Sequence, residues 1–235
     1  MSGEACWQLE VLTHGSENQP VVVMDSFVSD PHGLREDASF LSFSQIGEHY
    51  PGIRAVVPEA MLRPIVAALA PVVRDVFGLG DLSVVDSFYS LVTTPPDALA
   101  PIQRLPHFDE VSPTRLALLH YLADDGERSD EDIGGTAFFR QRSTGYESVD
   151  AARLPAYRAA LADDLAAHGM PNAGYIGADS PVFERIARHA GRFNRAILYR
   201  SNTLHCADIP AGMPLSADPF TGRLTVNTFL DAVAL

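Results

Sequence analysis

The sequence predicts a mainly β fold with flanking helices, an α+β chain arranged as a β-sandwich or β-barrel. Apolar runs of strand length lie at residues 84–94, 116–122 and 136–140, and Pro, Gly or charged residues bound them. Short strands separated by such turn signals are typical of sandwiches and barrels. A chain of 235 residues fits one large domain of this kind, so we expect a single domain over residues 1–235.

The composition excludes several classes of function. The formal net charge is -13, with 17 Lys+Arg against 30 Asp+Glu, and such a chain repels nucleic-acid phosphates and anionic membranes. We expect no signal peptide, because no basic segment leads into an apolar one, and no transmembrane helix, because no apolar run reaches about 18 residues. Cys6 and Cys206 are too few for a disulfide framework, so we expect a reduced, cytoplasmic environment.

Residues 1–80 are expected to support the core. An apolar run predicts a strand over 21–25, and an Asp-Pro pair begins a predicted helix over 31–39. Residues 58–76 carry apolar side chains at helical spacing, which predicts an amphipathic helix that Pro71 kinks or divides.

Beyond residue 80 the apolar period becomes strand-like. The predicted strands are 84–94, 116–122, 136–140, 195–199 and 223–230. Ala- and Leu-rich sequence predicts a helix over 151–168, and a shorter helix is predicted over 182–189. We therefore expect a β core over 82–140 and 195–231, with a helical insertion over 151–190.

A short motif, His107-Phe108-Asp109, carries the chemistry. On a strand, residues two apart project from the same face, so the imidazole and the carboxylate would converge. One more histidine would complete a facial triad for non-haem Fe(II), with positions left open for substrate and O2. The structural alternative is a surface histidine beside an aspartate in a turn.

Four segments in order resemble the Fe(II)/2-oxoglutarate-dependent dioxygenases, particularly their prolyl-hydroxylase-like branch. They are His107-Phe108-Asp109, residues 118–122 with Gly134-Gly135-Thr136-Ala137-Phe138, Asn202-Thr203-Leu204-His205, and Gly222-Arg223-Leu224-Thr225-Val226-Asn227. The resemblance implies a double-stranded β-helix, a jelly-roll of two sheets. It implies that His107, Asp109 and His205 bind Fe(II) and that the protein hydroxylates a small-molecule or peptidyl substrate. Relatives that halogenate lack the carboxylate that Asp109 provides.

The resemblance also assigns three residues to the co-substrate, 2-oxoglutarate. Arg223 would grip its far carboxylate with a planar fork of donors, and Tyr121 would donate its hydroxyl to the same carboxylate. Asn227 lies four residues past Arg223, so strand alternation aims both at one face. Arg223 follows His205 by 18 positions, which is long for the family and leaves open that another residue is the anchor.

Two other functions stay open: a catalytically inactive jelly-roll that binds a ligand or partner, and a cupin-type metalloenzyme that does not use 2-oxoglutarate. The insertion over 151–190 and the loop over 206–222 are expected to shape the substrate site. Nothing in the sequence identifies the substrate, and a homodimer is open. The acidic run over 124–132 is expected to be a solvated loop. We expect solvated side chains for the histidines without a partner at ligand spacing, which are His14, His32, His49, His168 and His189.

Overall fold

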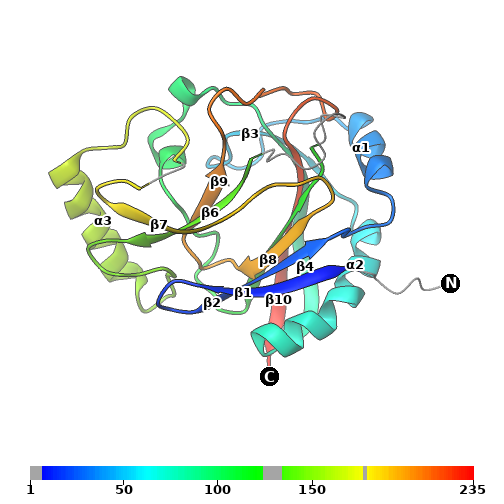
Figure 1. The fold of residues 1–235 in the computed structure, drawn as a ribbon, viewed down its shortest axis with the longest axis horizontal. Helices are drawn as coiled ribbons and strands as arrows, with labels where there is room; N and C mark the ends of the chain where they lie inside the picture. Colours follow the sequence, from blue (N-terminus) through cyan, green and yellow to red (C-terminus); the bar gives the residue numbers. More distant parts are fainter. Residues whose placement is uncertain (1–6, 124–133, 177–178) are drawn as a thin grey trace.

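Two antiparallel β-sheets face each other in the computed structural model, which describes residues 7–123, 134–176 and 179–235 (Figure 1). The larger sheet has seven described strands in the order β1-β2-β8-β5-β10-β4-β3. These are β1 (Gln8–His14), β2 (Gln19–Asp25), β8 (Ala196–Arg200), β5 (Arg115–Tyr121), β10 (Leu224–Ala234), β4 (Leu79–Val92) and β3 (Gly52–Val56). The described smaller sheet has the order β7-β6-β9, formed by Phe183–His189, Gly135–Gln141 and His205–Asp208.

The inner faces of the two sheets form one core. Phe138 of β6 packs edge-on against Tyr199 of β8, with ring centroids 5.1 Å apart, and Tyr121 of β5 joins the same cluster. All three side chains are at most 1% exposed. This arrangement confirms the predicted mainly β fold with flanking helices.

The helices cover outer surfaces. Helix α2 (Glu59–Val72) packs through Leu69 on the outer face of the larger sheet, and α3 (Leu154–His168) packs through Tyr157 on the smaller one (Figure 1). Helix α1 (Pro31–Ser39) begins where predicted, because the Asp30 side chain accepts a hydrogen bond from the backbone N–H of Gly33. After α2 the chain continues as a π-helical turn, η1 (Val73–Phe77), so the helix changes type two residues after Pro71.

One predicted helix is wrong. Within residues 182–189, Phe183–His189 form strand β7 instead, paired along β6. Strands β1 and β3 were not predicted. Both lie at the edges of the larger sheet, where one side of the strand has no neighbouring strand.

No helix in the described part of the chain is long and apolar enough to cross a bilayer. The acidic run over 124–132 lies outside the described residues, as does Cys6. Cys206 is a free, buried cysteine whose thiol donates to the carbonyl of Ile176.

Candidate metal centre

His107 and His205 are joined through their own main chains. They form an isolated antiparallel bridge in which each backbone N–H donates to the other's carbonyl, at 2.9 Å and 2.8 Å. The Asp109 N–H donates to the carbonyl of Ser201 at 2.8 Å. His107 and Asp109 were expected on a regular strand; they lie instead on a single bridge followed by a bend. The His205 segment therefore holds both motif residues in place.

The three side chains converge. Ligand atoms of His107, Asp109 and His205 lie within 4.8 Å of one another. His107 Nε2 is 3.6 Å from one carboxylate oxygen of Asp109, and His205 Nε2 is 3.6 Å from the other. Nitrogen and oxygen ligands about 2.1 Å from a metal and at right angles are roughly 3 Å apart, so a small contraction fits one ion. Two imidazoles and one carboxylate are the donor set of a facial-triad iron site.

The surroundings hold His205 in the form that binds metals. Its Nδ1–H donates to the Thr203 carbonyl at 2.9 Å, which leaves the lone pair on Nε2. Burial lowers the pKa of His205 to about 4, so the ring is neutral near pH 7. Burial raises the pKa of Asp109, but electrostatic interactions with the His205 and His107 rings, a hydrogen bond from His107 and the charge of Arg54 together lower it. The carboxylate is therefore ionised.

Arg223 lies where strand β10 begins, on the buried side of the larger sheet. Its side chain is 4% exposed, and Nε and Nη2 donate to the carbonyls of Gly134 and Gly135 at 3.2 Å and 3.0 Å. The guanidinium lies 5.6 Å from the centre of the Tyr121 ring. A Cβ on Gly135 would come within 1.8 Å of the His189 carbonyl, so glycine is required at this close approach.

The other two expected co-substrate residues share that face. Tyr121 and Thr225 are paired across β5 and β10, and Asn227 lies two residues further along β10. The Tyr121 hydroxyl is 2.7 Å from the Thr136 hydroxyl. The Asn227 Oδ1 is shielded from solvent and has no hydrogen-bond partner among the described residues. A buried polar atom without a partner is uncommon and marks a place where a ligand could bind.

Sequence reasoning missed four further polar groups of this interior. Arg54 belongs to strand β3 at the sheet edge, and Tyr50 lies just before this strand. Thr136 pairs with Tyr121, and the Tyr199 ring lies 4.9 Å from the His205 ring. Thr136 lies in a segment that carries the resemblance, but no role was predicted for it. No motif marks the other three residues, because only the folded sheet brings them together.

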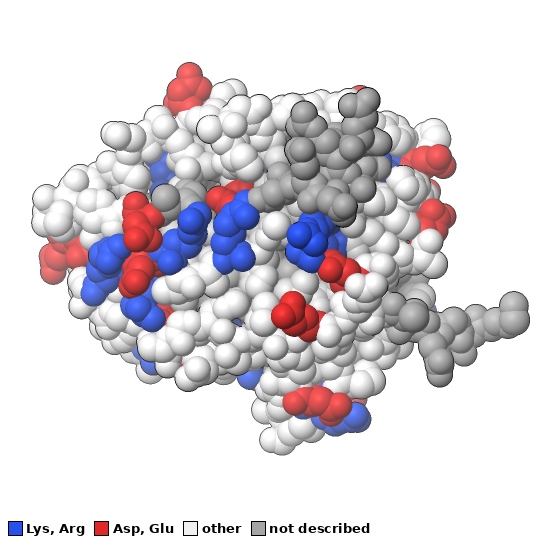
Figure 2. Space-filling model, in the orientation of Figure 1, with Lys and Arg blue, Asp and Glu red and all other residues white. Residues whose placement is uncertain are grey.

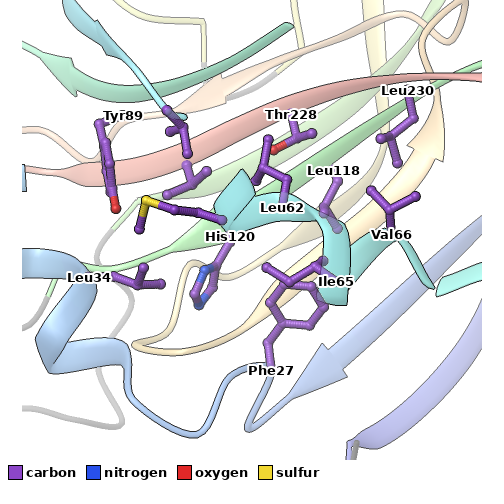
Figure 3. Close-up of a pocket in the computed structure, with 13 residues that line it drawn as sticks. Phe27, Leu34, Leu62, Ile65, Val66, Tyr89, Leu118, His120, Thr228 and Leu230 are labelled. Atoms are coloured by element: carbon purple, nitrogen blue, oxygen red, sulfur yellow. The ribbon is translucent and has the colours of Figure 1, made fainter. Parts of the chain in front are cut away.

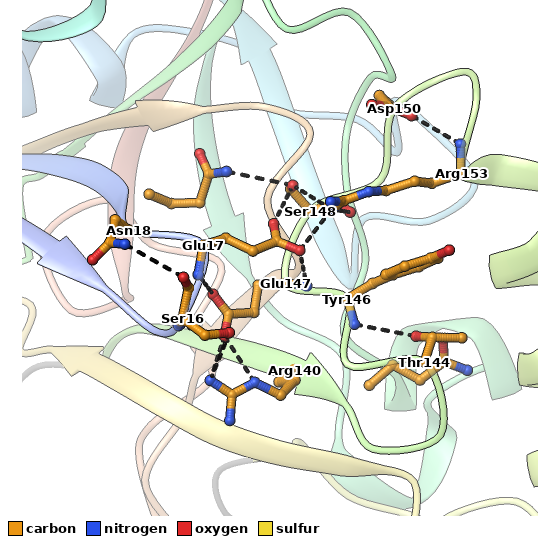
Figure 4. A network of polar contacts seen from close by, with 12 residues as sticks. Ser16, Glu17, Asn18, Arg140, Thr144, Tyr146, Glu147, Ser148, Asp150 and Arg153 are labelled. Atoms are coloured by element: carbon orange, nitrogen blue, oxygen red, sulfur yellow. Dashed lines mark hydrogen bonds and ion pairs between the residues drawn. The ribbon is translucent and has the colours of Figure 1, made fainter.

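Glu147 anchors the loop before His205 to the β1–β2 turn (Figure 4). Its fully buried carboxylate accepts hydrogen bonds from the Ser16 N–H and hydroxyl, from the next N–H and from the Arg140 guanidinium. Its backbone carbonyl accepts from the Leu204 N–H at 2.8 Å. The segment that leads into the distal histidine is thus fixed from outside the metal centre.

A cavity of about 30 Å³ lies elsewhere, under α2 (Figure 3). Val226 and Thr228 line it, and these alternate along β10 with the residues that face the metal centre, so the cavity is on the opposite face of the sheet. His120 also lines it, with Nε2 3.0 Å from the Asn194 Oδ1. His120 thus faces away from Tyr121.

The solvated state predicted for two histidines is wrong. The Nε2 atoms of His14 and His189 are 2.7 Å apart, and His189 is 8% exposed. The pair links β1 of one sheet to β7 of the other, a contact between sheet edges that the sequence spacing did not reveal.

Figure 2 shows basic side chains gathered in a band across one face of this acidic protein. Arginines of β6 and β7 and of the turn after β6 are neutralised locally. The ion pairs are Arg140 with Glu147 and Glu184, Arg142 with Asp179, and Arg188 with Asp208. In each pair the charge of an arginine is balanced by a carboxylate.

A family model described as a family of unknown function (DUF6445) matches residues 5–230. Comparison with curated proteins finds no match. Among solved structures, the non-haem α-ketoglutarate-dependent epimerase SnoN from nogalamycin biosynthesis is similar, with a TM-score of 0.50, 12% identity, and coverage of 92% of this chain and 79% of that one. At this identity the likeness shows the fold alone, and with the two facing sheets it confirms the predicted double-stranded β-helix, or jelly-roll.

Two other similar structures have lower scores. HygX from Streptomyces hygroscopicus, with nickel, 2-oxoglutarate and hygromycin B bound, has a TM-score of 0.49 and 15% identity, over 92% of this chain and 84% of that one. EctD from S. alaskensis with bound Fe has a TM-score of 0.45 and 15% identity, over 98% of this chain and 86% of that one.

Proposed function

We propose that this chain, which belongs to the DUF6445 family, is an Fe(II)- and 2-oxoglutarate-dependent oxygenase that hydroxylates a small-molecule or peptidyl substrate. The observation that carries the proposal is the convergence of His107, Asp109 and His205, with both imidazole nitrogens 3.6 Å from the carboxylate. SnoN, of the same fold, is described as α-ketoglutarate dependent, and this supports the proposal by analogy. Membership of the prolyl-hydroxylase-like branch stays a prediction.

The three side chains would hold Fe(II) on one face. Two neutral imidazoles and one carboxylate leave a net positive ion, which favours an anionic chelator in the remaining positions. The bound metal and 2-oxoglutarate would supply the oxidative chemistry with O2, while the chain supplies ligation and orientation. His205 is held as the Nδ1–H tautomer by Thr203, so its Nε2 needs no rearrangement before it binds a metal.

Arg223 would bind the far carboxylate of 2-oxoglutarate. Two of its nitrogens are held by backbone carbonyls, which fixes the guanidinium and leaves Nη1 to donate. The hydroxyls of Tyr121 and Thr136 carry two protons, and their mutual hydrogen bond uses one. The other proton is free to point at the same carboxylate. Asn227, whose Oδ1 has no partner among the described residues, would line this site.

The experiment that tests the proposal is anaerobic Fe(II) loading followed by O2 and 2-oxoglutarate, with succinate measured by NMR. We expect metal-dependent succinate formation even without substrate. We expect Arg223→Ala to raise the 2-oxoglutarate requirement at least tenfold, because a buried charge-assisted pair is lost, while the exposed Arg63→Ala control does not. His205→Ala should abolish both metal binding and turnover.

The alternatives predict different results. A protein that binds no metal would be an inactive jelly-roll. Metal binding without consumption of 2-oxoglutarate, together with an unaffected Arg223→Ala variant, would indicate a cupin-type metalloenzyme. Either result overturns the proposal.

We also infer a single cytoplasmic domain without nucleic-acid or membrane partners, from the charge of -13 and the cysteine content. The segments over 151–190 and 206–222 would shape the substrate site. A homodimer is compatible with these inferences.

A further inference from the structure

A second guanidinium lies on the inner face of the larger sheet. Arg54 of β3 is paired with Ser90 of β4, Ser90 with Thr225 of β10, and Thr225 with Tyr121 of β5. Side chains of residues directly opposite each other in antiparallel strands project from the same face. Arg54 therefore points to the side of the sheet on which Tyr121 lies.

Arg54 has no anionic partner of its own. Its guanidinium lies 3.9 Å from the centre of the Tyr50 ring and 5.2 Å from that of Phe88, and its Nε is shielded from solvent. No described residue accepts a hydrogen bond from it or forms an ion pair within 4.0 Å. Burial lowers its pKa, and the charges of Tyr50, Asp109 and Asp86 oppose that effect. An arginine held between aromatic rings without a partner is a costly arrangement unless a ligand completes it.

The Tyr50 hydroxyl is shielded from solvent and makes no hydrogen bond within 3.5 Å to a described residue, while the Ser90 side chain acts on it as a hydrogen-bond partner and lowers its pKa. Burial raises its pKa, while the positive charges of Arg223 and Arg54 and the hydrogen bond with Ser90 act against this. A neutral hydroxyl beside a guanidinium is a donor pair suited to a carboxylate.

Two guanidinium groups in one interior indicate two anions. Arg223 is fixed by the carbonyls of Gly134 and Gly135 and would serve the co-substrate. Arg54 is not anchored in this way, and it lies on the same inner face of the sheet as Tyr121 and Asn227. We propose that Arg54 and Tyr50 bind a carboxylate of the substrate, and that the substrate is an organic acid. This inference rests on the proposed function and narrows its substrate class.

The test separates substrate from co-substrate. Protein loaded with Zn(II) and saturated with N-oxalylglycine, an unreactive analogue of 2-oxoglutarate, is titrated with amino, hydroxy and aromatic carboxylic acids. Each acid is paired with its carboxamide. Binding is followed by calorimetry and by the ¹H–¹⁵Nε resonance of Arg54, which its absence in Arg54→Gln identifies. Arg54→Gln, Tyr50→Phe and the exposed control Arg63→Gln are compared, with N-oxalylglycine affinity measured for each.

We expect at least one acid to bind and shift the Arg54 resonance while its carboxamide does not. Arg54→Gln should weaken this acid at least tenfold and Tyr50→Phe by a smaller factor, with N-oxalylglycine affinity changed less than twofold. The inference is overturned if no acid binds, if Arg54→Gln binds the acid as well as wild type, or if Arg54→Gln loses N-oxalylglycine. Should wild type fail to bind Zn(II) or N-oxalylglycine, the proposed function fails instead, and the same titrations of metal-free protein still decide the role of Arg54.

Discussion

His120 should make the free energy of unfolding fall as the pH drops from about 6.5 to about 4. Its side chain is 2% exposed, with the Phe27 ring centroid 5.0 Å away and the Asn194 Oδ1 as the partner of Nε2. Burial lowers its pKa from 6.5 to about 4. The unfolded chain therefore takes up a proton near pH 6.5, and the folded chain does so only near pH 4.

The magnitude follows from these two values. Each pKa unit is worth about 1.4 kcal/mol, so the full change corresponds to roughly 3 kcal/mol. The contribution of His120 to stability is complete above pH 6.5 and is lost progressively as the pH falls toward 4, because its folded-state pKa is depressed. The pKa of His189 is lowered to the same value, so more than one histidine contributes to the pH dependence of wild-type stability.

Replacement of His120 by Leu isolates its contribution to the pH dependence of the free energy of unfolding. Urea unfolding of wild type and His120→Leu at pH 7 and pH 4.5 should show roughly 2–3 kcal/mol less pH dependence in the variant. Asn194 keeps a partner in the variant, since its Oδ1 also accepts the Val28 N–H at 3.0 Å. The exposed His49→Gln control should follow wild type. Equal pH dependence in wild type and His120→Leu would refute the reasoning.

Three further predictions concern the metal centre and its supports. Zn(II) at 100 times its dissociation constant should stabilise wild type by about 2.7 kcal/mol, raising Tm by about 5–10 °C in a scanning calorimeter, and should leave His205→Ala unchanged. Glu147→Gln should cost about 3 kcal/mol in urea unfolding, because a buried ion pair is broken, whereas Glu184→Gln, at 40% side-chain exposure, should cost well under 1 kcal/mol. Gly135→Ala should displace the strand that holds Arg223 and weaken N-oxalylglycine at least tenfold in calorimetry; unchanged affinity would contradict that anchor.

Local signals in the sequence located much of the fold. The helix over 31–39 was predictable because its cap and its first-turn proline are adjacent in the chain. Predicted strands over 116–122 and 136–140 differ from β5 and β6 by about one residue at each end. In these strands most side chains are buried, so the apolar run and the strand coincide.

The strands at the sheet edges were not predicted, because fewer of their side chains are buried and their sequence patterns are therefore less distinct. Strand β1 is largely exposed along its length, and even its apolar Leu9 and Val11 are exposed, so the burial that marks a core strand is missing. Strand β7 mixes buried Phe183 with exposed Arg185, a pattern that fits a short helix as well as a strand. Pairing with β6 decides between them, and pairing is not a local property of the sequence.

The residues of the candidate site were also only partly predictable from local signals in the sequence. His107 and Asp109 are two residues apart, so their convergence was predictable from the chain. Resemblance, and not periodicity, brought in His205 and Arg223. Arg54 was missed because its strand was missed, and only the pairing of β3 with β4 places it on the inner face.

The reciprocal hydrogen bonds between the backbones of His107 and His205 have a consequence for how the site is assembled. These two residues are 98 positions apart, and their spacing is fixed when the chain folds, before an ion binds. A cation that binds finds both imidazole nitrogens already in place, and only the Asp109 carboxylate has to adjust its position. Loss of the ion would then leave the donors in place, so exchange of one metal for another would proceed without unfolding the protein.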